Sequence, residues 1–159
     1  MWKLLHALAK LCAILAGVLL TLITLMTCAS VIGRNTTGAT LVGDFELTGV
    51  AAGAAVALFM PWCQCVRGNI IVDFFTAGAS AQTNQRFDRL GAALLGAALG
   101  LLTWRTAIGG LSAWTSQSTT MMLGFPEWIA YALMVPPLAL TTLIALWQAL
   151  AGFAPETDR

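Results

Sequence analysis

Apolar stretches and short polar connections alternate along the whole of this 159-residue chain. Three of the stretches contain no Asp, Glu, Lys or Arg, namely residues 11–33, 47–66 and 128–155. A fourth stretch, residues 90–111, is interrupted by Arg105 alone. Because the hydrocarbon core of a bilayer takes about 20 apolar residues per helix, the pattern predicts an integral membrane protein with four spanning helices. We expect these helices at about residues 5–32, 45–66, 87–111 and 127–152.

The backbone of a spanning segment has to pair all its polar groups, which in lipid leaves helices or a closed barrel. Barrel strands alternate apolar and polar residues, whereas runs such as Ile14–Leu20 do not alternate. The fold class that we expect is therefore an all-α integral membrane protein. Its four-transmembrane-helix bundle would form a single membrane domain over residues 1–159, because the connections are too short to hold a soluble catalytic domain.

Positive charges are distributed unevenly between the two sides of the expected bundle. Six Lys and Arg residues fall on the side of the two termini: Lys3, Lys10, Arg67, Arg86, Arg89 and Arg159. The other side carries Arg34 and Arg105. Since cytoplasmic connections carry the excess of Lys and Arg, we expect both termini in the cytoplasm. The first apolar run exceeds the roughly 7–15 residues of a signal-peptide core, so we interpret it as a retained helix.

Small residues recur at four-residue spacing in the second and third expected helices. The two sets are Gly49, Gly53 and Ala57, and Ala92, Gly96 and Gly100. Such stripes allow helix backbones to approach closely in a membrane. We therefore predict helix packing at Gly49, Gly53, Gly96 and Gly100.

The first expected helix carries two different faces. Small and hydroxyl residues form one face: Gly17, Thr21, Thr24 and Cys28. Larger apolar residues form another: Leu15, Leu19, Leu22 and Met26. By the same packing rule, we expect the first face to contact protein and the second to contact lipid.

Charged and aromatic residues near the ends of the apolar stretches are candidate contacts with a partner protein or with lipid headgroups. They are Arg34, Glu46, Arg67, Asp73, Arg105 and Trp128. Arg105 is the one charge inside an apolar stretch, and such a charge is a functional candidate. Its position near the expected end of the third helix favours a simpler role, a side chain that reaches the headgroups. Glu46 begins the second helix, where a carboxylate also suits the helix dipole.

The residues that membrane enzymes and carriers commonly need are missing. His6 is the only histidine, which excludes a bis-histidine haem site within the chain and argues against a histidine metal site. No Asp or Glu lies in the middle of an expected helix, so the usual proton relay is absent. A net charge of +1 gives no basic face for nucleic acid. We expect no enzyme activity, no cofactor, no metal and no substrate-binding residues, and an accessory subunit rather than a carrier that acts alone.

The four cysteines give no sign of a disulfide or a redox pair. Cys63 and Cys65 are two residues apart, so on a helix their thiols point in different directions. Cys12 and Cys28 lie inside the first expected helix. We interpret all four as small apolar packing residues.

Four segments, in order, resemble the small membrane subunit of tripartite ATP-independent periplasmic (TRAP) transporters, the DctQ-like family. They are Val31-Ile32-Gly33-Arg34 with Gly38, then Glu46, then Gly68-Asn69-Ile70-Ile71-Val72-Asp73, and then Leu123–Trp128 with Tyr131 and Pro136. The resemblance covers about residues 31–137. In two places the chain departs from the family pattern: Asn69 stands where the family usually has His, and Glu46 lacks a second acidic neighbour.

The resemblance implies a multi-pass protein of the bacterial inner membrane. It also implies two partners, a large permease subunit that forms a heterodimer with it and a periplasmic substrate-binding protein. In such a system the small subunit would scaffold sodium-driven uptake of an organic acid. Two alternatives remain open at this point: a small subunit of a tripartite tricarboxylate carrier, and a membrane anchor for a redox enzyme.

Overall fold

The computed structural model describes residues 2–38, 41–69 and 81–152. Four helices account for most of them: α1 (Trp2–Thr37), α2 (Asp44–Cys65), α3 (Ala81–Ser116) and α4 (Trp128–Ala151). All four are long and apolar enough to cross a membrane. The all-α class with four spanning helices is thereby confirmed.

Two of the helices are longer than their apolar stretches. Both α1 and α3 contain 36 residues, about 54 Å at about 1.5 Å per residue, whereas the hydrocarbon core is about 30 Å thick. Beyond the apolar run of α1, Asn35 and Thr36 donate side-chain hydrogen bonds to the backbone carbonyls of Val31 and Ile32, one turn earlier. Hydropathy reports only the part of a helix that lies in lipid, so the expected bounds were too short.

The C-terminal ends of α2 and α3 are closed in the same way. After each helix one residue has a positive φ, Arg67 at 56° and Gln117 at 51°. The next amide then bonds back to a carbonyl five residues earlier, Gly68 N–H to Cys63 O and Ser118 N–H to Ala113 O. This left-handed turn satisfies carbonyls that the helix leaves unpaired, and it ends both helices without a glycine at the left-handed position.

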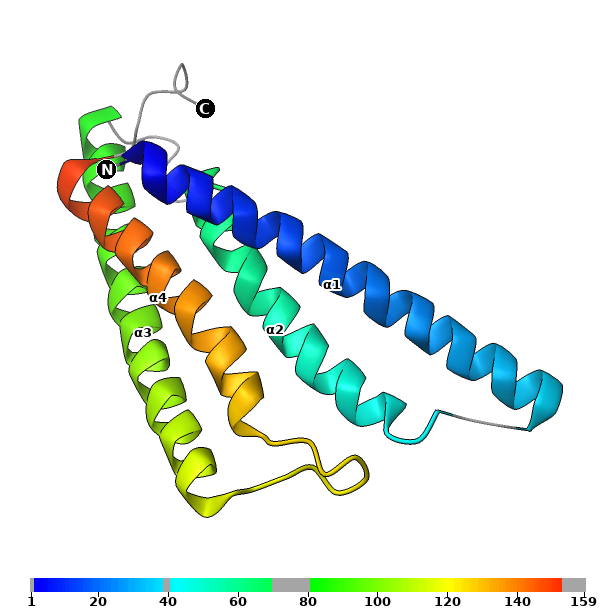
Figure 1. Cartoon of the computed structure of the whole chain (residues 1–159). Helices are drawn as coiled ribbons and strands as arrows, with labels where there is room; N and C mark the ends of the chain where they lie inside the picture. The colour runs from blue at the N-terminus through cyan, green and yellow to red at the C-terminus, as the bar shows by residue number, and fades with distance from the viewer. Residues whose placement is uncertain (1, 39–40, 70–80, 153–159) are drawn as a thin grey trace.

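The helices lie in the order α1, α2, α4, α3, so that α1 and α3 are at the two edges of the bundle (Figure 1). Neighbours α1 and α2 are antiparallel, as are α3 and α4, whereas α2 and α4 run parallel. Within the described helices, α3 contacts only α4. The molecule therefore consists of two antiparallel pairs, α1–α2 and α3–α4, that meet mainly where α2 packs on α4.

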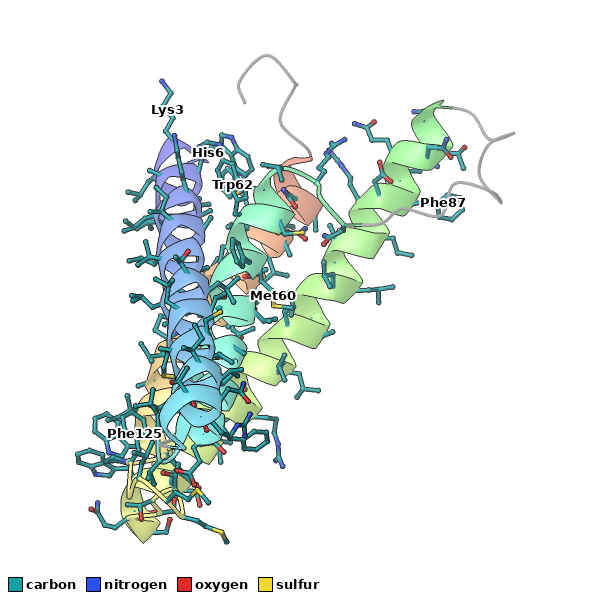
Figure 2. All side chains as sticks on the ribbon, turned by 90° about the vertical axis from the view of Figure 1, so that its right-hand side faces the viewer. Lys3, His6, Met60, Trp62, Phe87 and Phe125 are labelled. Carbon is teal, nitrogen blue, oxygen red and sulfur yellow. The ribbon has the colours of Figure 1, made fainter. Side chains whose placement is uncertain are left out.

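We name the two ends of the bundle by what they contain. The terminal end holds the start of α1 and the end of α4, and the loop end holds the connections that follow α1 and α3 (Figure 1). At the terminal end Ala9, Cys65 and Ile144 form a buried cluster from three helices. Beside it the rings of His6 and Trp62 lie 5.1 Å apart, and Figure 2 shows them together at the start of α1.

The face of α1 that packs on α2 differs from our expectation. Ala9, Ala16 and Ser30 are buried, and Leu19 and Met26 on the same side are half-buried. This side of α1 packs on α2, whose buried residues include Ala54, Ala55 and Ala57. The assignment of Leu19 and Met26 to lipid was therefore wrong.

The small and hydroxyl face of α1 is turned away from the rest of the chain. Thr21, Thr24 and Cys28 are exposed, and no atom lies within 4 Å of a Cβ built on Gly17. The hydroxyls of Thr21 and Thr24 donate to the carbonyls of Gly17 and Leu20 in their own helix. This hydrogen bonding is local, and the face makes no contact with another helix of the described chain, so the expected contact with protein stays a prediction for a partner protein.

The glycines of the two stripes lie in different surroundings. A Cβ built on Gly53 would be 2.5 Å from Met134 Cε, and one on Gly96 would be 3.0 Å from Leu146 Cδ2. At Gly100 the nearest atom is Thr142 Cγ2 at 3.4 Å, and at Gly49 nothing lies within 4 Å. Gly53 on α2 and Gly96 and Gly100 on α3 therefore face α4, whereas Gly49 is exposed and packs on no helix of the described chain.

Candidate functional site

The suspected anchor residues divide between the two ends of the bundle. Arg34 lies in the last turn of α1 and Glu46 in the first turn of α2, both at the loop end. Arg67 follows α2 at the terminal end, and its side chain is exposed. Asp73 lies outside the described residues, so its prediction stays as it was.

Arg105 is deeper in its helix than the sequence indicated. Because α3 continues to Ser116, Arg105 stands about three turns before the end of the helix. Its side chain is exposed on the surface of the chain. Among the described residues no salt bridge to Arg105 is formed, so the choice between a lipid headgroup and a partner protein stays open.

Glu46 makes the most specific polar contact at the loop end. Its Oε1 accepts a hydrogen bond from the backbone N–H of Met122 at 2.9 Å, and its Oε2 accepts one from the N–H of Leu123 at 3.2 Å. Hydrogen bonds to an ionised acceptor are stronger than those between neutral groups. The carboxylate thus fastens the α3–α4 connection to the start of α2.

The α3–α4 connection is itself folded as a tight loop. Thr120 and Phe125 exchange two hydrogen bonds, from Thr120 N–H to Phe125 O and from Phe125 N–H to Thr120 Oγ1. Thr119 pairs with Pro126 in an isolated β-bridge. These contacts leave Met121 fully exposed at the tip, with a relative exposure of 100%. The loop therefore presents an apolar tip, and Glu46 holds the two residues that follow this tip.

Two further contacts order the loop end. Gly43, with φ of 78°, begins α2, and Leu123 occupies the space that a Cβ at Gly43 would need. Between α1 and α2, the buried hydroxyl of Ser30 donates to Asp44 Oδ2. Asp44 is therefore a contact between two helices as well as an acidic residue in a first helical turn.

Trp128 begins α4 and packs against the last turns of α3. Its ring meets that of Trp114 edge-on, with centroids 4.8 Å apart and planes at 80°. This geometry is a favourable one for aromatic pairs. Trp128 thus joins α3 to α4 at the loop end, and it is half-buried rather than fully exposed to lipid.

A buried amide network lies at the terminal end, between α2 and α4. Gln64 Nε2 donates to Gln148 Oε1 at 2.7 Å, and Gln148 Nε2 donates to the backbone carbonyl of Gln64 at 3.0 Å. Asn69 Nδ2 donates to Gln64 Oε1. Gln64 is 5% exposed and Gln148 2%. Asn69, which stands where the resembled family usually has His, therefore extends a bridge between two helices.

Our reading of the sequence missed this network, although a signal was present. Gln64 and Gln148 are uncharged polar residues inside stretches that were judged only by their lack of charge. In lipid, amide side chains commonly bond across helices. What the sequence did not supply was the pairing, because the two residues are 84 positions apart.

The other buried polar side chains also find partners inside the chain. Apart from the two glutamines they are Ser30 and Thr141, and Thr141 donates to the carbonyl of Pro137 one turn earlier. All four cysteines are free, and Cys63 Sγ lies 3.5 Å from Asn69 Oδ1. Across residues 2–38, 41–69 and 81–152, no group of three or more His, Cys, Asp or Glu residues comes together as a metal site.

Comparison with known proteins adds one finding. The family model described as tripartite ATP-independent periplasmic transporters, DctQ component, matches residues 23–154. The match includes all of α2, α3 and α4 and the second part of α1. No curated protein and no solved structure matches the chain.

Proposed function

The chain belongs to the DctQ family of tripartite ATP-independent periplasmic transporters, and on this premise we propose that it scaffolds the large permease subunit in the membrane. The observation that carries the proposal is the family match over residues 23–154, which spans most of the four-helix fold. DctQ is a transporter component family and not an enzyme family. The match favours neither the tricarboxylate-carrier alternative nor the redox-anchor alternative.

The hydrogen bonding of four buried polar side chains supports a scaffolding role over a transporting one. A secondary transporter binds substrate and coupling ion near the midplane, where broken helices expose polar groups. Here the four buried polar side chains in the described residues all bond within the chain: Ser30, Gln64, Thr141 and Gln148. No polar group in this set remains to hold a solute.

The transport reaction that we propose for the complete system is sodium-driven uptake of an organic acid. The large permease would hold the substrate and sodium sites, and a periplasmic binding protein would deliver the substrate. This chain would contribute exposed apolar helix faces to the permease, with Arg34, Glu46, Arg67 and Arg105 as anchors near its surfaces. In such interfaces buried apolar and aromatic side chains carry most of the affinity and rim charges carry less.

Association with the permease is the direct test. When both chains are expressed together and extracted in mild detergent, an affinity tag on this chain should recover the permease in equimolar amount. An unrelated four-helix membrane protein with the same tag is the control and should recover none. Recovery of this chain alone at every detergent concentration tested would contradict the proposal.

Orientation is a second proposal, with both termini in the cytoplasm of a bacterium and the loop end in the periplasm. Reporter fusions after Arg34 and near Ser116 should show periplasmic activity, and a fusion after Ser80 should show cytoplasmic activity. The physical reason is the excess of Lys and Arg on the side of the termini. Periplasmic activity of the Ser80 fusion would reverse the topology.

A further inference from the structure

We propose that two polar contacts, one between α2 and the α3–α4 connection at the loop end and one between α2 and α4 at the terminal end, hold the α1–α2 pair and the α3–α4 pair at a fixed angle. Glu46 makes the contact at the loop end, and Gln64 with Gln148 makes the one at the terminal end. The inference rests on the proposed scaffolding function, because a scaffold supports a moving partner only if its own shape is fixed. These three residues are therefore positioning residues.

The order of the helices makes such contacts necessary. α3 touches only α4, and the described helices show only slight contact between α1 and α4 beside the extensive packing of α2 on α4. Rotation of one pair against the other about the α2–α4 contact would consequently meet little resistance from α1 or α3. Resistance has to come from the contacts of α2 with α4 and with the α3–α4 connection.

The apolar part of the α2–α4 interface is poorly suited to fix an angle. On α2 the buried apolar residues include Ala54, Ala55 and Ala57. Small side chains allow helices to approach closely. The dispersion attraction between such side chains, however, has little directional preference. Hydrogen bonds, in contrast, weaken steeply when donor and acceptor move out of line.

The amide contact at the terminal end is well placed to fix the register of the two helices. Both polar atoms of the Gln148 side chain bond to the same residue, Gln64. The oxygen accepts from the Gln64 side chain, and the nitrogen donates to the Gln64 backbone carbonyl. That carbonyl lies in the last turn of α2 and also accepts a long hydrogen bond from the backbone N–H of Arg67, at 3.4 Å. A small slide of α4 along α2 would break both bonds in a buried site, where no water replaces them.

The carboxylate contact at the loop end acts at the other end of α2, on the connection that leads from α3 into α4. Glu46 lies 18 positions before Gln64, so about 27 Å of helix separates the two contacts at about 1.5 Å per residue. The amide of Leu123 bonds to Glu46, and the side chain of Leu123 packs against Gly43. Two contacts that far apart prevent a rotation that either contact alone would permit.

The distance between two spin labels at the loop end, one on α1 and one on α3, tests this inference. Thr36 and Ser116 are exposed residues in the last turns of α1 and α3, one in each pair. In the full chain, with the four native cysteines replaced by alanine, labels at these sites in nanodiscs should give a narrow distance distribution. We expect Gln148→Leu and Glu46→Ala each to increase its width at least twofold. Gln148→Met keeps the length of the side chain and also removes both hydrogen bonds. It should increase the width by the same factor, and it replaces Gln148→Leu in the test if Gln148→Leu folds poorly.

Matched control variants distinguish a loss of the fixed angle between the two helix pairs from a general loss of stability. Thr142→Val removes a hydroxyl that lies 3.4 Å from Thr103 Oγ1, a contact within the α3–α4 pair, and should leave the width unchanged. Glu46→Gln keeps one acceptor oxygen and should give an intermediate width. An unchanged width in the Gln148 variants or in Glu46→Ala would overturn the role of that contact, and equal broadening in Thr142→Val would overturn both. The measurement uses this chain alone, so it is independent of whether the permease binds.

Discussion

The purified chain, alone in liposomes, should move no organic acid under an inward sodium gradient. Addition of the large permease and the binding protein should produce uptake at least tenfold above the liposome background. The reason is that solute and ion sites need free polar groups near the midplane. No Asp or Glu lies mid-helix in this sequence, and the buried amides Gln64 and Gln148 bond to each other.

The controls for this measurement are the permease with the binding protein but without this chain, and the complete system without sodium. Both should remain near background if this chain supports the permease and sodium supplies the driving force. Radiolabelled uptake over the first minute is the readout. Sodium-driven uptake by this chain alone would refute the scaffolding function and would require a binding site that the described residues do not show.

Gly96→Leu should have the largest effect of any single substitution that we predict on folding. A Cβ at Gly96 would lie 3.0 Å from Leu146 Cδ2 and 3.4 Å from the Leu146 backbone nitrogen. Leucine adds three carbon atoms beyond Cβ in space that the Leu146 side chain already fills, so Leu146 would have to shift or α3 and α4 would have to separate. Overpacking of a filled interior costs about 1–3 kcal/mol and occasionally more. We expect the yield of monodisperse protein in detergent to fall severalfold, measured by size-exclusion chromatography.

Gly49→Leu is the matched control, because it makes the same substitution in a helix at a stripe position with nothing within 4 Å. Its yield should equal that of the parent chain. Gly53→Ala should also be tolerated, since its one close neighbour is the flexible end of Met134. If Gly96→Leu and Gly49→Leu reduced the yield equally, the packing of α3 on α4 at Gly96 would be wrong.

The class of the fold could be predicted from the sequence because lipid imposes a simple requirement. Every spanning segment needs a length of apolar residues and an internally paired backbone, and both requirements are local. The bounds of α1 and α3 could not be predicted in the same way. Their extra turns carry polar residues such as Asn35 and Thr36, whose side chains bond to the helix backbone.

The roles of particular residues were less predictable than the helices. Glu46 was singled out for its charge, but its two bonds go to a loop 76 and 77 positions later. Leu19 was assigned to lipid because it is large, yet it is half-buried on the side of α1 where Ala16 and Ser30 are buried. In each case the outcome depends on which neighbour the fold supplies.

The sequence by itself determined the solvent, the number of spanning helices and the family to which the chain belongs, since these follow from local composition and from the order of motifs. The tertiary structure alone decided the order α1, α2, α4, α3, the face that each helix buries, and the pairing of Gln64 with Gln148. Apolar faces pack on lipid and on one another with similar energies, because lipid tails are as apolar as the side chains. Hydrophobicity therefore places a helix in the membrane but does not select its neighbours, and shape and a few hydrogen bonds make that selection.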